Sequence, residues 1–197
     1  MVITKRTVTP KEFDQFLTAH AHEDQIYELI NGEIVEKMPS NTESSQFSTL
    51  LAAFLVMYMR QNPIGYVTGE AGGYTVDGER YAPDAAVILK PNAPTQDWFA
   101  PFPPNLAVEV DYPSSRQSLR VLSTKISHYL AAGTVVWVVF PEDKEIEVHI
   151  PCQAVKILRV GDTLDGGTML PGFTLPVSEI FPPEVTDQLE QKDESPE

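Results

Sequence analysis

The sequence is poor in cysteine and has no long hydrophobic stretch. Cys152 is the only cysteine, so no disulfide can form within the chain, and a reducing compartment is favoured. The longest apolar stretch, residues 50–59, is too short to span a membrane, and the opening residues lack the apolar core of a signal peptide. We therefore expect a cytoplasmic protein that does not associate with a membrane.

Positive charge is also scarce. The 197 residues include 14 Lys and Arg against 28 Asp and Glu, which gives a net charge of −14 at pH 7. Residues 183–197 contain six acids and one lysine, so −5 of this charge lies at the end of the chain and −9 on the remainder. Proteins that bind nucleic acid non-specifically are usually basic. The composition therefore argues against a large electrostatic surface for DNA, although a small local one is compatible with it.

The length and the 42% hydrophobic content suffice for one well-packed domain. We predict a single domain over residues 1–182 and an acidic, disordered tail over residues 183–197, where the sequence is polar and bounded by proline. The proline-rich loop 90–104 carries Trp98, Phe99 and Phe102. It could form a lid or a contact surface, but a connection tucked against the domain is the simpler interpretation.

Helix and strand signals alternate along the chain. Asn31-Gly32 between two strand-like runs is typical of a β-hairpin over residues 27–36 with a type I′ turn. Helices are predicted after the Thr9 cap, over residues 43–61, and from Pro113 to Gly133, where Ser114 and Gln117 have capping-box spacing.

Several short strands surround these helices. They are predicted over residues 66–68, 74–76, 85–89, 106–111, 135–140, 145–150 and 155–160, before a turn-rich closing segment. This order predicts an α/β or α+β fold in which helices flank a mixed sheet, with β-hairpins near both ends of the domain.

Two carboxylates interrupt apolar strand sequences. Asp84 directly precedes the strand 85–89, and Glu109 lies within the strand 106–111. Glu109 and Asp111 are two residues apart, so both side chains point to the same face of a strand. Burying a carboxylate is costly unless a cation, a metal ion or a hydrogen-bond network compensates it. Carboxylates on adjacent strands suit Mg²⁺ or Mn²⁺, so we predict a metal site of Asp84 and Glu109 with Asp111 as a further ligand.

Lys125 lies on the helix that follows the Glu109 strand and shares a side of that helix with Tyr129. Its ammonium group can therefore reach back over the carboxylates. A metal ion beside a lysine suits the hydrolysis of a phosphodiester. The ion polarises the phosphate and activates a water molecule, while the lysine stabilises developing charge or orients the water. Because unpaired carboxylates repel each other, we expect removal of Asp84 or Glu109 to leave stability unchanged or to raise it.

These residues also allow simpler interpretations. Asp84 could cap a strand, Asp111 could face solvent, and Lys125 could be an ordinary surface lysine. Glu28 in the predicted hairpin could reach the site or be an exposed strand residue. Arg116 and Arg120, one helical turn apart, could contact phosphates or belong to a solvated helix face.

Several motifs follow one another in a fixed order along the chain. They are Tyr27-Glu-Leu-Ile-Asn-Gly-Glu-Ile-Val35, Pro83-Asp84, Glu109-Val110, Lys125-x-x-x-Tyr129-x-x-x-Gly133, Val136-Trp137-Val-Val139, and the closing run from Asp162 to Phe181. In this order and spacing, over residues 13–181, the chain resembles the Uma-type family of restriction-endonuclease-like proteins, within the PD-(D/E)XK nuclease fold. It departs from the family pattern at Asp111 and Tyr112, where an apolar residue and Ser are usual, and at Val121, where an acid is common.

The resemblance implies a metal-dependent nuclease core and homodimers. Asp84 and Glu109 would hold Mg²⁺ or Mn²⁺, Asp111 would replace a lost ligand, and Lys125 would be the catalytic lysine of an endonuclease acting on DNA. The departures favour a rival hypothesis, a catalytically inactive and homodimeric interaction module on the same fold. A weaker third hypothesis is a hydrolase for a small phosphorylated molecule, and the apolar loop 98–102 is a candidate dimer contact.

Overall fold

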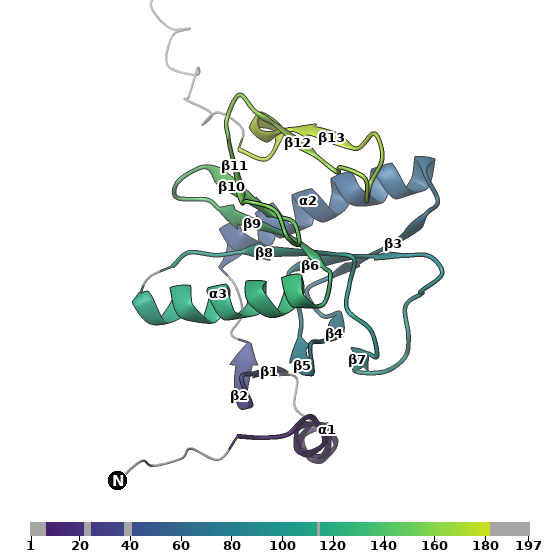
Figure 1. The fold of residues 1–197 in the computed structure, drawn as a ribbon, viewed down its shortest axis with the longest axis vertical. Coiled ribbons are helices and arrows are strands. Elements are labelled where there is room, and N and C mark those ends of the chain that lie inside the picture. Colours follow the sequence, from purple (N-terminus) through teal and green to yellow (C-terminus); the bar gives the residue numbers. More distant parts are fainter. Residues whose placement is uncertain (1–6, 22–24, 38–40, 114, 182–197) are drawn as a thin grey trace, which may run out of the picture.

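The computed structural model describes residues 7–21, 25–37, 41–113 and 115–181 of the chain. Its centre is a six-stranded mixed sheet with α2 on one face and α3 on the other (Figure 1). A smaller five-stranded sheet lies on the α3 side, and α1 packs against that sheet. The structure thus has the mixed sheet with flanking helices that the sequence predicts. Within the described ranges, no helix is long and apolar enough to cross a membrane.

The central sheet has the order β11-β10-β9-β8-β6-β3, in which β8 and β9 run parallel and the other neighbours antiparallel. Its strands are β3 (Gly65–Gly69), β6 (Ala85–Leu89), β8 (Leu106–Val110), β9 (Val135–Phe140), β10 (Glu145–His149) and β11 (Lys156–Arg159). Val87 and Val108 belong to the core beneath α2, whereas Ala86 and Ala107 belong to the core beneath α3. Because side chains alternate along a strand, Asp84 and Glu109 are directed to the α3 face.

Side-chain caps define where the helices begin. In α1 (Pro10–Ala19) the predicted Thr9 cap is confirmed, and in α2 (Thr42–Gln61) Asn41 accepts a hydrogen bond from the Ser44 N–H. Helix α3 (Arg116–Ala131) begins at Ser115, whose hydroxyl accepts a hydrogen bond from the Ser118 N–H. The predicted pair of Ser114 and Gln117 is therefore not the cap, and Ser114 itself lies outside the described residues.

Glycine ends α3 as the sequence predicts. Gly133 follows the helix with a φ of 84°, a left-handed conformation that glycine adopts without strain. The chain then enters β9 directly, so α3 is tied at its end to the middle of the central sheet. This connection fixes α3 across the face to which the carboxylates point.

The smaller sheet contains the predicted hairpin of β1 (Ile26–Ile30) and β2 (Glu33–Lys37). Asn31 and Gly32 have φ values of 52° and 69°, both positive as a type I′ turn requires. The sheet has the order β2-β1-β5-β4-β7 and continues through β5 (Glu79–Tyr81), β4 (Gly73–Val76) and β7 (Phe99–Ala100). Strands β5 and β7 are too short to give a periodic sequence signal. Because β7 pairs with β4, part of the loop 90–104 is packed against the domain.

The last described elements form a hairpin of β12 (Thr163–Asp165) and β13 (Thr174–Pro176), followed by the short helix η1 (Val177–Glu179). Leu164, Leu170 and Phe173 from this segment are buried with α2 and the central sheet. The segment therefore closes the core on the face opposite α3. The tail predicted over residues 183–197 lies outside the described residues.

Candidate active site

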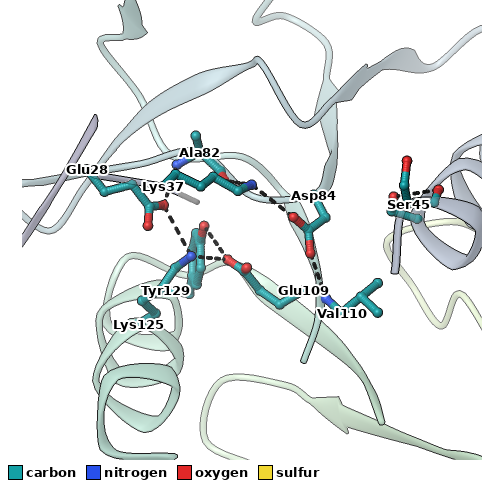
Figure 2. A network of polar contacts seen from close by, with 10 residues as sticks. Glu28, Lys37, Ser45, Ala82, Asp84, Glu109, Val110, Lys125 and Tyr129 are labelled. Atoms are coloured by element: carbon teal, nitrogen blue, oxygen red, sulfur yellow. Dashed lines mark hydrogen bonds and ion pairs between the residues drawn. The ribbon is translucent and has the colours of Figure 1, made fainter. Parts of the chain in front are cut away.

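Asp84 and Glu109 lie opposite each other where β6 and β8 pair. Ala85 is the partner of Val108, so the next position along the antiparallel register brings Asp84 opposite Glu109. The Asp84 N–H donates to the Val108 carbonyl at 3.0 Å, and Asp84 Oδ2 accepts from the Val110 N–H at 2.8 Å. Both acids are buried; Glu109 points toward Lys125 and Tyr129 of α3, and the Asp84 carboxylate lies between Lys37 and the Val110 N–H (Figure 2). Strand pairing thus brings the two predicted metal ligands together.

Lys125 of α3 lies against Glu109. Its Nζ is 2.8 Å from Glu109 Oε1 and 3.2 Å from Glu28 Oε1, and it lies 5.6 Å from the centre of the Tyr81 ring. One turn further along α3, the Tyr129 hydroxyl donates to Glu109 Oε1 at 3.2 Å. Lys125 is 7% exposed, so the interpretation as a surface lysine does not hold. Its ammonium group bridges two carboxylates that come from different sheets.

The hairpin β1–β2 supplies two further charges to this cluster. Glu28 is buried, and its Oε1 also accepts a hydrogen bond from the Ala82 N–H at 2.8 Å. Lys37 places its Nζ 2.9 Å from Asp84 Oδ1 and 2.8 Å from the Ala82 carbonyl oxygen. Glu28 therefore reaches the site and is not an exposed strand residue. Sequence reasoning missed Lys37, although the type I′ turn fixes a register that puts both residues on one face of the hairpin.

Asp111 lies just beyond β8 and is half-buried. Its backbone N–H donates to the Val139 carbonyl at 3.0 Å, which continues the pairing of β8 with β9. Burial raises the pKa of the Asp111 carboxyl; the Tyr112 backbone N–H and Lys125 oppose this rise, and Asp84 adds to it. Asp111 thus shares the electrostatic field of the cluster. The hydrogen bonds and ion pairs described for Asp84, Glu109 and Lys125 do not include its side chain.

Burial and mutual charge shift the titration of the clustered groups. The pKa of Glu109 is raised to about 7, because burial and, to a smaller extent, the carboxylates of Asp84 and Glu28 outweigh the lowering by Lys125. Burial disfavours the charged form of Lys125, but Glu109 and Glu28 raise the pKa of its ammonium group above the ordinary value. Lys125 is therefore a permanent cation near neutral pH, whereas Glu109 exchanges its proton in that range.

The donor set fits a hard divalent cation in its chemistry. Three carboxyl groups, from Glu28, Asp84 and Glu109, face two ammonium groups, from Lys37 and Lys125, which leaves one excess negative charge when Glu109 is ionised. Carboxylate oxygens are the ligands that Mg²⁺ and Mn²⁺ prefer. In the present arrangement each acid is bonded to a lysine, and among the described residues no three His, Cys, Asp or Glu side chains converge closely enough to chelate an ion.

A groove of about 670 Å³ runs between the hairpin and α3. Glu33 and Val35 of β2 form one wall, and the other wall includes Gln117, Arg120 and Thr124 of α3. Because side chains alternate along a strand, Lys37 lies on the same side of β2 as Glu33 and Val35. The groove lining stops at Val35, and the next side chain of this row is Lys37, which pairs with Asp84.

The mixed sheet with a helix on each face (Figure 1) is the architecture of a restriction-endonuclease-like protein. The model of the Uma2 family, described as "Putative restriction endonuclease", matches residues 10–178, and the chain belongs to this family.

A solved structure shares the fold. It is the crystal structure of "a putative nuclease belonging to DUF820" from Anabaena variabilis ATCC 29413, with a TM-score of 0.74 and 17% sequence identity. The match covers 88% of this chain and 97% of that chain. No curated protein sequence matches the chain. At this identity the structural similarity establishes the fold and leaves the chemistry to be argued from the site.

Proposed function

We propose that this protein is a metal-dependent endonuclease that hydrolyses DNA phosphodiester bonds. Asp84 and Glu109 would hold Mg²⁺ or Mn²⁺, and Asp111 would offer a further oxygen at the end of β8. The observation that carries the proposal is the buried set of Asp84, Glu109 and Lys125 on one face of a central sheet, in a member of a restriction endonuclease family. A bound ion would polarise the phosphate and lower the pKa of a coordinated water molecule.

Lys125 is suited to stabilise the negative charge that develops on a phosphate during hydrolysis. Its ammonium group is held between Glu109 and Glu28, and such a fixed cation in a site shielded from water needs little reorganisation during the reaction. Tyr129 positions Glu109 by donating to the same oxygen that Lys125 contacts. Glu28 and Tyr129 would therefore position the two residues that touch the ion and the phosphate.

Cleavage of supercoiled plasmid DNA tests the proposal. In the presence of Mg²⁺ or Mn²⁺ we expect nicked and linear products, and we expect Asp84→Asn, Glu109→Gln and Lys125→Met each to slow cleavage by about 100-fold or more. Glu36→Gln, at an exposed position of the same hairpin, is the matched control and should cleave normally. Circular dichroism would show that each variant is folded. Undiminished cleavage by folded Glu109→Gln would contradict the assignment.

A second candidate function is a catalytically inactive, homodimeric interaction module. It is favoured by the ion pairs that already satisfy Asp84 and Glu109, and by the net charge of −14. Trp98, which is 61% exposed, would belong to the dimer contact. In that case millimolar Mn²⁺ would leave the melting temperature unchanged, because only a ligand bound by the native state raises it. Sedimentation of wild type and Trp98→Ala would test the dimer.

A further inference from the structure

The two lysines of the cluster are held very differently. Lys125 contacts two carboxylates and the Tyr81 ring, and its side chain is 9% exposed. Lys37 contacts one carboxylate and one backbone carbonyl, and its side chain is 18% exposed. A lysine ammonium sits on a flexible stem of four carbons and keeps its hydration wherever solvent is within reach. Lys37 is therefore the cation of this cluster that can leave with the smaller loss of interactions.

Asp84 uses its two oxygens for two different partners. Oδ2 accepts a hydrogen bond from the Val110 N–H, which is part of the backbone of the central sheet and cannot move away. Oδ1 accepts from Lys37, whose side chain can rotate. A divalent cation next to Asp84 would be strongly repelled by an ammonium group bonded to the same carboxylate. The Lys37 ammonium and a divalent ion therefore compete for one carboxylate.

We propose that Lys37 is a built-in counter-ion of Asp84 that binding of a divalent ion displaces, while Lys125 stays in place. This inference rests on the proposed function in so far as the ion is the Mg²⁺ or Mn²⁺ assigned there. It explains how Asp84 is compensated before the ion arrives. Lys37 is then a positioning residue that sets the affinity of the site for metal.

Calorimetric titration of the full chain with Mn²⁺, without DNA, measures this competition directly. Removing the charge in Lys37→Met should lower the Kd for Mn²⁺ roughly tenfold, as expected for one partly screened unit charge at short range. Lys37→Arg keeps the charge and should bind Mn²⁺ more weakly than Lys37→Met does. Lys156→Met, an exposed lysine of β11, makes the same change in net charge and should match wild type.

A second measurement uses the wild-type protein and does not depend on how any variant folds. Lysine amines are labelled with an acylating reagent with and without Mn²⁺, and the label on each lysine is quantified by mass spectrometry. We expect Mn²⁺ to increase labelling of Lys37 relative to Lys156 and to leave Lys125 protected. Unchanged or decreased labelling of Lys37 would overturn the inference.

The outcomes separate this inference from the proposed function. If wild type and Lys37→Met bind Mn²⁺ with equal affinity, displacement of Lys37 is wrong and metal-dependent cleavage still stands. If neither protein binds Mn²⁺, metal-dependent cleavage is wrong and the inference fails with it. Binding by Lys37→Met that clearly exceeds binding by wild type supports both.

Discussion

The central sheet and the β1–β2 hairpin each contribute side chains to the charged cluster, but they position them differently. The central sheet presents Asp84 and Glu109 on paired strands, so backbone hydrogen bonds fix these acids. The hairpin brings Lys37 to Asp84 across 47 positions and Glu28 to Lys125 across 97 positions of the sequence. The central sheet thus carries two of the three acids, and the hairpin carries the third acid and the lysine that pairs with Asp84. Burial of the acids therefore depends on the hairpin being docked against α3.

The largest effect is expected from breaking the link between the two halves at Lys125. In Lys125→Met, Glu28 and Glu109 remain buried without their shared cation, and a loss of about 3–5 kcal/mol in the free energy of unfolding is expected. Urea denaturation at pH 8, where Glu109 is ionised in the wild type, measures this loss. Lys156→Met should change stability by less than about 0.5 kcal/mol. If Lys125→Met lowered the free energy of unfolding by less than about 0.5 kcal/mol, Lys125 would not stabilise the cluster.

A smaller effect is expected on the hairpin side. Lys37→Met leaves Asp84 with its hydrogen bond from Val110, and the pair is partly open to solvent, so a loss of about 1–2 kcal/mol is expected. The same urea denaturation gives the value, with Lys156→Met again as control. If Lys37→Met lowers the free energy of unfolding as much as Lys125→Met does, the two lysines contribute equally to stability, and Lys37 is as well shielded from solvent as Lys125.

The sequence predicts the sheet half of the site better than the hairpin half for a physical reason. An acid such as Glu109 within an apolar strand is a local anomaly, and strand alternation then gives its direction. Lys37 stands beside Glu36 in an ordinary polar strand sequence, and only docking of the hairpin shows what it meets. The order of elements was predictable from periodicity and turn residues, whereas β7 is two residues long and is defined by its pairing with β4.

Because the sequence does not show that Asp84 and Glu109 are paired with lysines, the effect on stability that it predicts for their removal must be corrected. The sequence expectation treats Asp84 and Glu109 as unpaired acids whose removal relieves repulsion. The structure pairs Asp84 with Lys37 and Glu109 with Lys125, so removal of either acid leaves a lysine with fewer partners. A decrease in stability is therefore the expected result for alanine at either position.

The pH dependence of stability tests how well Glu109, on the central sheet, is shielded from solvent, and the expected effect is smaller. Burial raises the pKa of Glu109 from 4.5 to about 7 in the folded protein, while the unfolded chain titrates near the ordinary value. Between these values the folded protein keeps a proton that the unfolded chain has lost. The contribution of Glu109 to the free energy of unfolding should therefore fall as the pH rises from 4.5 to about 7. Urea denaturation across this range should show a flatter profile for Glu109→Gln, and an unchanged slope would mean that Glu109 is more solvated than the structure indicates.

The smallest effect is expected in the groove that separates the two halves. Arg120 is exposed and lines the α3 wall, so it is placed to neutralise a phosphate of a DNA strand that follows the groove to the carboxylates. Under the proposed function, Arg120→Gln should weaken DNA binding uniformly across sequences and reduce the slope of log K against log salt by about one. Fluorescence anisotropy at several salt concentrations measures both quantities in Ca²⁺, which binds oxygen ligands and should allow binding without rapid cleavage. Arg60→Gln on α2, across the central sheet, should leave the slope unchanged. An equal change in both variants would mean that DNA does not follow this groove, and that the hairpin contributes charge to the acids without contributing a wall to the substrate site.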